Sequence, residues 1–137
     1  MPLHIPTLGE RVTEADIWAY AERQLTKGLA KEEDSGTLTA DGTEQELVNK
    51  ESAEPFMSQL ILDVANMTGT DQILITETMK VLAGGGLEQF TRTHITGSQE
   101  EPILIFTPKY AVRQYRVTFQ QLAGAYKDFD WSLIVEE

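Results

Sequence analysis

Glu77 is the carboxylate in this sequence whose position could make it chemically active. It falls on the same alternation as Ile73 and Ile75, so a strand here would turn it toward the core. A carboxylate on an inward face is costly to bury unless it is paired, and such groups serve as general acids or metal ligands. The simpler expectation is that Glu77 lies near the wet end of its strand or pairs with an arginine, for which the candidates are Arg92, Arg113 and Arg116.

Two further sets of residues could take part in chemistry. His94 could act as a base beside Glu77 or Glu88, although a surface histidine on a strand is the simpler interpretation. Carboxylate oxygens suit calcium, but the chain lacks the dense Asp/Asn/Gly spacing of a dedicated calcium loop. The carboxylates considered for such a site are Asp41, Asp63 and Asp71.

The remaining signals for catalysis are absent from the sequence. Gly84-Gly85-Gly86 is followed by neither a lysine nor a helical pattern, which indicates a hairpin turn and not a phosphate loop. No serine has the Gly-x-Ser-x-Gly setting of a nucleophile. The chain has no cysteine, which excludes disulfides, thiol catalysis and cysteine-based zinc sites. We therefore expect no enzyme, no cofactor and no bound metal.

Length and charge narrow the class of protein. The chain has 137 residues, 22 acidic against 11 basic side chains and a formal charge of -11. Its length suits one domain, and its acidic balance argues against a nucleic-acid partner. No apolar run is long enough to cross a membrane, and the first residues do not resemble a signal peptide. We expect a protein that is made in the cytoplasm without a signal peptide.

Residues 1–30 are expected to form an N-terminal arm and one helix. Pro2 and Pro6 favour an extended arm, and Thr13 followed by Asp16 predicts a helix over residues 14–26. A helix this short is marginal alone in water, so it must dock on another surface. Trp18, Ala21 and Leu25 could meet copies of themselves in a dimer or trimer, or this face could fold onto its own domain. The predicted interface residues are Ile5, Leu8, Ile17, Trp18, Tyr20, Ala21 and Leu25.

The rest of the chain predicts a β domain. Residues 31–35 are expected to be a solvated acidic linker, inside a stretch of residues 31–54 with eight acidic and two basic side chains. Residues 36–137 then alternate between apolar and polar side chains in about eight short strands, with a tight hairpin expected at Asp41-Gly42. This spacing is typical of an antiparallel β-sandwich of the jelly-roll or immunoglobulin-like type.

Aromatic residues near the expected loops could present a surface to sugar rings. The candidates are Tyr110, Tyr126 and Phe129, although core or rim positions explain them more simply. Trp131 belongs to the last alternating segment and is expected to be a core residue.

Several segments resemble a family of small β-rich proteins of tailed phages and related archaeal tailed viruses. The segments are GTLTADGTEQ at 36–45, LDVANM at 62–67, MKVLAGG at 79–85, RVTFQQLAG at 116–124 and FDWS at 129–132. Separately, EADIWAYA at 14–21 is similar to an N-terminal module of phage virion proteins. At Glu77 the similar sequences usually carry an apolar residue.

The resemblance implies a virion structural protein whose β domain is held on the particle by its N-terminal segment. A capsid decoration or cement protein is the favoured role, with the major capsid protein and copies of this chain as partners and the capsid surface as its location. A tail, neck or baseplate component is the alternative, and a carbohydrate-binding module for host adsorption comes third.

Overall fold

The computed structural model describes residues 30–136, which fold into strands and loops without a helix. The arm and helix expected before residue 30 lie outside this part of the chain. Among residues 30–136 there is accordingly no helix that could cross a membrane. The nine strands are β1 (Lys31–Thr39), β2 (Gln45–Glu51), β3 (Phe56–Asp63), β4 (Gln72–Lys80), β5 (Leu87–Thr96), β6 (Ile103–Ile105), β7 (Lys109–Ala111), β8 (Gln114–Ala123) and β9 (Asp128–Glu136).

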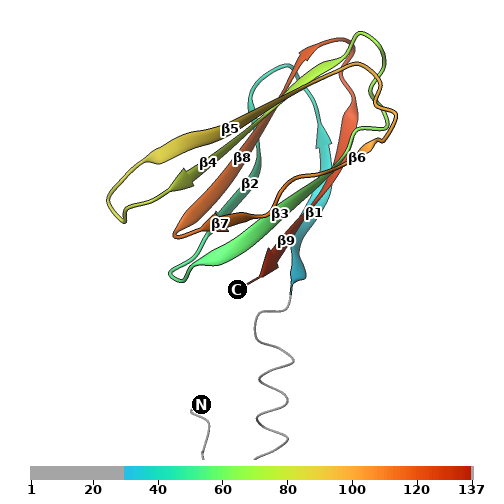
Figure 1. Ribbon diagram of the computed structural model, residues 1–137. Helices are drawn as coiled ribbons and strands as arrows, with labels where there is room; N and C mark the ends of the chain where they lie inside the picture. The colour runs from blue at the N-terminus through green and yellow to red at the C-terminus, as the bar shows by residue number, and fades with distance from the viewer. Residues whose placement is uncertain (1–29, 137) are drawn as a thin grey trace, which may run out of the picture.

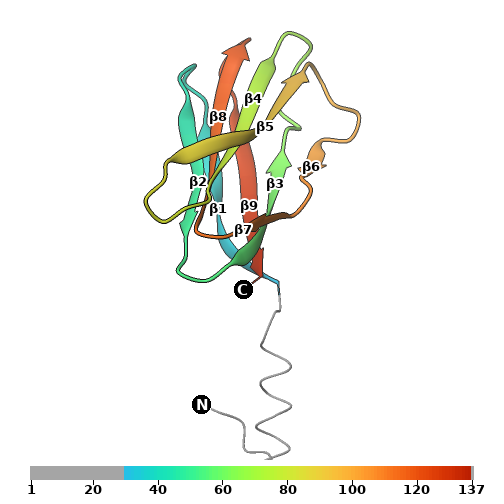
Figure 2. The same ribbon diagram turned by 60° about the vertical axis from the view of Figure 1, so that its left-hand side comes forward.

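The strands form two antiparallel sheets that lie face to face (Figure 1). One sheet has the order β1-β9-β3-β6, with β7 also paired to β3, and the other has the order β2-β8-β4-β5. The chain therefore pairs its first strand with its last and its second strand with its next to last. Figure 2 shows the same two layers after rotation, with β2, β8, β4 and β5 in front of β1, β9 and β3.

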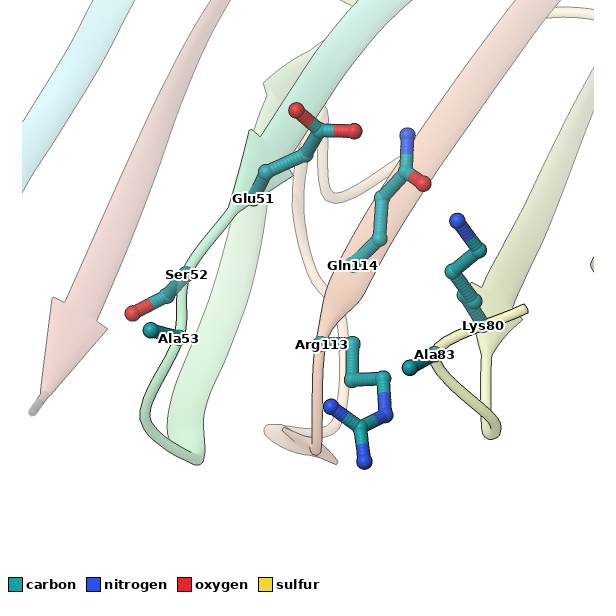
Figure 3. Close-up of a pocket in the computed structure, with 7 residues that line it drawn as sticks. All are labelled: Glu51, Ser52, Ala53, Lys80, Ala83, Arg113 and Gln114. Carbon is teal, nitrogen blue, oxygen red and sulfur yellow. The ribbon is translucent and has the colours of Figure 1, made fainter. Parts of the chain in front are cut away.

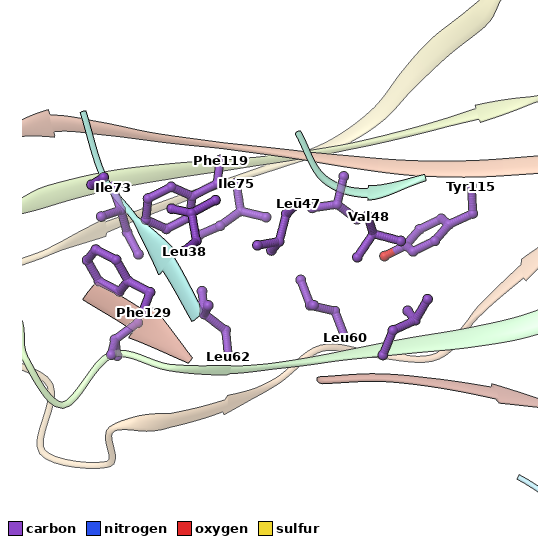
Figure 4. Close-up of a cluster of buried hydrophobic side chains, with 14 of the residues drawn as sticks. Leu38, Leu47, Val48, Leu60, Leu62, Ile73, Ile75, Tyr115, Phe119 and Phe129 are labelled. Carbon is purple, nitrogen blue, oxygen red and sulfur yellow. The ribbon is translucent and has the colours of Figure 1, made fainter. Parts of the chain in front are cut away.

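The core lies between the two sheets and follows the alternation of the sequence (Figure 4). Along β3, buried and partly buried side chains alternate without interruption. The rings of Phe119 and Phe129 meet across the two sheets with centroids 4.8 Å apart. The large side chains that are almost fully buried include Phe56, Leu60, Leu62, Ile73, Ile75, Tyr115, Phe119, Phe129 and Leu133.

The turn at Asp41-Gly42 has the expected positive φ at the glycine alone, and it does not have the expected role. Gly42 adopts a positive φ of 83°, and Asp41 accepts hydrogen bonds from the backbone and hydroxyl of Thr43 at 2.9 and 2.6 Å. The flanking strands do not pair with each other, because β1 pairs with β9 while β2 pairs with β8. The predicted hairpin is therefore wrong: the turn carries the chain from one sheet to the other.

The acidic segment runs along one side of the sandwich. Residues 31–35, expected to be a linker, form the first half of β1 and pair with β9. They are exposed, as expected, because β1 is the edge strand of its sheet. Glu33 on β1 and Lys50 on β2 form an ion pair of 2.8 Å between the two sheets. Charged side chains along both edge strands disfavour the addition of further strands there.

After residue 80 the structure confirms one predicted turn, adds one short strand and moves one predicted core residue to the margin of the core. Gly84-Gly85-Gly86 lies in the connection between the paired strands β4 and β5, which confirms the hairpin. The apolar run 103–106 supplies β6, and a further short strand, β7, follows Pro108. Trp131 is only partly buried, because it lies at the margin of the core, where its ring covers Gly36 on the neighbouring strand.

Candidate functional site

Glu77 points into the sandwich, as its alternation predicts, and is 1% exposed. Its carboxylate accepts hydrogen bonds from the hydroxyls of Tyr115 at 2.5 Å and Thr91 at 2.6 Å. The ammonium of Lys109 lies 3.6 Å away and comes from β7 of the opposite sheet. The expected arginine partners are wrong, because Arg92 and Arg116 occupy outward positions and Arg113 bonds to the carbonyl of Val81.

A β-bulge in β5 lies directly beside Glu77 and its partner Thr91. Thr78 pairs with Gln89 and Glu77 pairs with Thr91, so Phe90 is the extra residue on β5. Thr91 lies directly opposite Glu77 and turns its hydroxyl to the carboxylate, and the ring of the bulged Phe90 lies 6.3 Å from that of Tyr115. Burial, and then the hydrogen bond to Glu77, raise the pKa of the Tyr115 hydroxyl well above its ordinary value.

A groove of about 400 Å³ lies beside this cluster, between the edge strands β5 and β6. Its polar lining includes Thr91, Thr93, Glu101, Thr107 and Lys109, and Ile95, Leu104 and Phe106 form much of its apolar part. Glu77 borders the groove but is engaged by two hydroxyls and one ammonium, with almost no exposed surface. This arrangement joins the two sheets at their open side and leaves Glu77 closed to a substrate, so the exposed carboxylate of the groove is that of Glu101.

The other titratable candidates are dispersed. His94 is exposed on the outer side of β5, where its Nε2 lies 3.3 Å from Gln72 Oε1, and it does not approach Glu77. Asp63 caps the backbone nitrogen of Ala65 at 2.8 Å. Within residues 30–136 no three His, Cys, Asp or Glu side chains gather in a group that could hold a metal ion.

Asp71 is the second buried carboxylate and anchors the loops at the upper end of the sandwich. Its Oδ2 accepts hydrogen bonds from Lys127 Nζ at 2.7 Å and from the backbone nitrogen of Thr68 at 2.8 Å. These bonds, that of Lys127 first, hold the pKa of Asp71 below its ordinary range. The other oxygen has no hydrogen-bond partner and lies against Gly124. This role could not be predicted from the sequence, because Lys127 is 56 residues away from Asp71.

A shallow cleft of about 370 Å³ lies at the opposite end, where β2 and β4 finish and β8 begins. Figure 3 shows Gln114 between Glu51 and Lys80, in agreement with their cross-strand pairing. In the same view Arg113 lies below these three residues, just before β8 begins. The cleft has the negative charge of Glu51 on one side and the positive charge of Lys80 on the other. Because both signs of charge are present, the cleft does not select one class of ligand.

The aromatic residues suggested for sugar binding do not come together. Phe129 is fully buried in the core, so this candidate is wrong. Tyr110 is on β7 near the lower end, paired with Met57 of β3. Tyr126 is in the loop before β9 at the upper end, where its hydroxyl packs over Gly42. No shared aromatic platform exists among the three.

The most distinctive surface is an apolar strip on the outside of the β1-β9-β3-β6 sheet. Ile61 and Ile105 face each other on adjacent strands, and Ile134 lies beside Gln59 on the same outer face. Ile103, Ile105 and Tyr110 are 50%, 66% and 66% exposed. We call this surface the outer apolar strip, and it consists of Met57, Ile61, Ile103, Ile105, Tyr110 and Ile134.

The rest of the same face is polar. Thr37 and Thr39 on β1 donate hydrogen bonds to Asp130 and Asp128 on β9, at 2.6 and 2.7 Å. The outer apolar strip therefore has a sharp boundary within one sheet. Contiguous apolar patches on a protein surface mark sites of interaction more often than isolated apolar residues do.

The chain joins the sandwich next to this strip. Ala30, Met57, Pro108 and Ile134 line a small hollow of about 90 Å³ at the lower end of the sheet. The predicted interface residues all precede Ala30 and lie outside the described part of the chain: Ile5, Leu8, Ile17, Trp18, Tyr20, Ala21 and Leu25. The structure thus places the end of their segment, but not the residues themselves. The strip was missed because the run 103–106 shows apolar side chains on both faces without showing which face is covered.

Comparison with known proteins adds no assignment, because no protein-family model and no curated protein matches this sequence.

Proposed function

We propose that this chain is a structural protein of a virus particle and acts as a capsid decoration or cement protein. Its partners are the major capsid protein and copies of itself, and its location is the capsid surface. The phage-like segments, GTLTADGTEQ at 36–45 and EADIWAYA at 14–21 foremost, support the virion context. The chain is small, and its charge of -11 suits a particle exterior that must not adhere to other particles or to anionic cell surfaces.

We further infer that the sandwich is a jelly roll. The pairs β1/β9, β2/β8 and β4/β5, with β3 against β6 and β7, correspond to one long antiparallel hairpin rolled into two sheets. Strand orders of this kind define the jelly roll, in which β6 and β7 together take the place of one interrupted strand. The fold occurs in viral capsid domains and in unrelated proteins, so it is compatible with the proposed function without specifying it.

The single observation that carries the proposal is the outer apolar strip beside Ala30. The strip reaches the end of the domain at which Ala30 enters β1, and the sequence before Ala30 carries the predicted interface residues. Such a pair of surfaces suits a protein whose work is association. The candidate acid–base groups, by contrast, are either engaged within the sandwich, as Glu77 is, or exposed alone, as His94 is.

In this account residues 1–29 attach the sandwich to neighbouring subunits, and the contacts are made by the predicted interface residues. Pro2 and Pro6 would keep the first residues extended, which increases their reach. The apolar side chains of residues 14–26 would supply the buried part of the contact, because a short helix needs a partner surface to be stable.

A tail, neck or baseplate component remains the alternative, because the same surfaces would serve assembly at those sites. Carbohydrate binding is less well supported, since Tyr110 and Tyr126 lie at opposite ends of the sandwich and Phe129 is buried.

Removal of residues 1–29 tests the attachment role. The remaining chain contains all nine strands and should fold, but it should be absent from purified particles. Thr37→Ala in the full chain is a suitable control, because it changes the polar half of the outer face and should leave incorporation intact. Incorporation of the shortened chain at the parental level would contradict the proposed attachment.

A further inference from the structure

The outer apolar strip lacks a cover within the described part of the chain. Ile103 and Ile105 project from β6, the edge strand of its sheet, and Tyr110 projects from β7. On the opposite side of β6, Leu104 packs against the core, as does Phe106 directly after the strand. The short edge strand β6 therefore has apolar side chains on both of its faces. We expect both faces to be buried in the assembled protein, the inner one by the sandwich and the outer one by a further segment of protein.

The strip has the length of the segment predicted to be helical. From Met57 to the level of Ile103, which pairs with Asp63, β3 advances six residues, or about 20 Å. Residues 14–26 would form a helix of about 20 Å. An apolar helical face of that length would cover the strip from one end to the other.

The connection between these two surfaces is short. Only residues 27–29 separate the predicted helix from Ala30, which borders the hollow at the lower end of the strip. The predicted helix must therefore end near an outer apolar strip. This can be the strip of the same chain or the strip of an adjoining copy. A short connection favours exchange of a segment between copies, since exchange avoids a tight reversal of the chain.

We infer that residues 14–26 of one copy cover the outer apolar strip of a second copy. The choice of a second copy over the same chain rests on the proposed function, which requires contacts between subunits. Ile17, Trp18, Ala21 and Leu25 then meet Met57, Ile61, Ile105 and Ile134 across the interface. Each copy gives one helix and receives one, which closes a dimer or a ring of a few subunits.

Cross-linking between copies gives a direct test, because the chain has no cysteine and single thiols can be placed at will. One full-length preparation carries Ala21→Cys, and a second, labelled with a heavy isotope, carries Ile105→Cys. The mixture is dissociated, reassembled and treated with a short bismaleimide. We expect a cross-linked species containing one chain of each mass. Leu122→Cys replaces Ile105→Cys in the control, because Leu122 is 46% exposed and lies near the upper end of β8, outside the strip.

Point variants test the same contact by mass in solution. Ile105→Lys and Leu25→Lys should each reduce the assembly to single chains in sedimentation velocity, whereas Leu122→Lys should keep the parental mass. Circular dichroism and urea unfolding show that each variant is folded. A parent chain that is monomeric overturns the inference. So does a chain carrying both Ala21→Cys and Ile105→Cys that cross-links only within itself, because its helix then covers its own strip.

The inference and the proposed function fail in different ways. Purified protein that exchanges its helix but is absent from particles refutes the virion role alone. Protein that joins particles as single chains, without the mixed cross-link, refutes the exchange alone.

Discussion

The hydroxyl of Tyr115 donates a hydrogen bond of 2.5 Å to the buried carboxylate of Glu77. The two residues belong to neighbouring strands of one sheet, β8 and β4, and Lys109 reaches the same carboxylate from the other sheet. Glu77 is therefore satisfied inside the sandwich, at the side where the strands of the two sheets leave a groove. This arrangement explains how a strand can carry a carboxylate among core residues without exposing it to solvent.

Removal of the Tyr115 hydroxyl should weaken the fold. Tyr115→Phe leaves the carboxylate with one donor fewer in a buried setting, which should lower the free energy of unfolding by about 2 kcal/mol. Urea unfolding at neutral pH measures the difference. Tyr126→Phe is the matched control, because Tyr126 is 61% exposed and should unfold as the parent does. Equal midpoints for Tyr115→Phe and the parent would show that the hydrogen bond contributes nothing.

Tyrosine ionisation should distinguish Tyr115 from the exposed tyrosines. The folded-state pKa of Tyr115 is raised, so its neutral form stabilises the fold fully below about pH 10, and this stability declines at higher pH. In a spectrophotometric titration we expect one tyrosine to ionise only as the protein unfolds in alkali. That delayed step should disappear in Tyr115→Phe and persist in Tyr110→Phe. Ionisation of every tyrosine in a single early step would contradict the buried hydrogen bond.

The ion pair of Asp71 and Lys127 should make stability depend on acid pH. The folded-state pKa of Asp71 is lowered from about 3.8, so its contribution is present above that pH and is lost as the pH falls further. Asp71→Asn should destabilise the protein by about 2 kcal/mol at pH 7, because Lys127 loses its charged partner. The partial exposure of Lys127 to solvent keeps this cost moderate. Unfolding measured from pH 7 to pH 2 should show the variant and the parent converging. A constant difference over this range would contradict the assignment.

Gly124 should be intolerant of a side chain. It has a positive φ of 88°, and an added Cβ would clash with the Oδ1 atom of Asp71. Gly124→Ala should therefore cost at least about 2 kcal/mol, from backbone strain together with the clash against a buried carboxylate. Gly84→Ala is the control, because an added Cβ there meets nothing within 4 Å and should change stability little. Similar thermal midpoints for the two variants would contradict the packing described for Gly124.

The alternation of the sequence predicted much of the strand content but not the pairing of strands. Period two along 56–64 and 115–119 placed Phe56, Leu60 and Phe119 in the core, because burial of one face of a sheet forces that pattern. At Asp41-Gly42 the expected positive φ was correct for the glycine alone, and the predicted hairpin was wrong. Turn residues fix the backbone over a few positions, whereas the partner of each strand depends on contacts as distant as Lys31 with Val135.

The candidate site was predicted in a similar, partial way. Glu77 was placed on the inward face, but its partners were missed because the register that sets Thr91 opposite Glu77 cannot be read from the sequence and Lys109 comes from the other sheet. The outer apolar strip was visible only as an apolar run at 103–106. Such a run looks the same whether its second face is covered by the domain itself or by a partner, and the sandwich shows that Ile103 and Ile105 are uncovered.

The central claim is that this chain is a structural part of a virus particle, and its copy number tests that claim most directly. Particles produced from a genome that encodes the chain would be purified by density gradient and analysed by quantitative mass spectrometry against the major capsid protein. A capsid decoration protein should be present in hundreds of copies per particle. A few dozen copies or fewer would contradict the capsid role in favour of the tail or neck, and absence from purified particles would contradict the virion role itself.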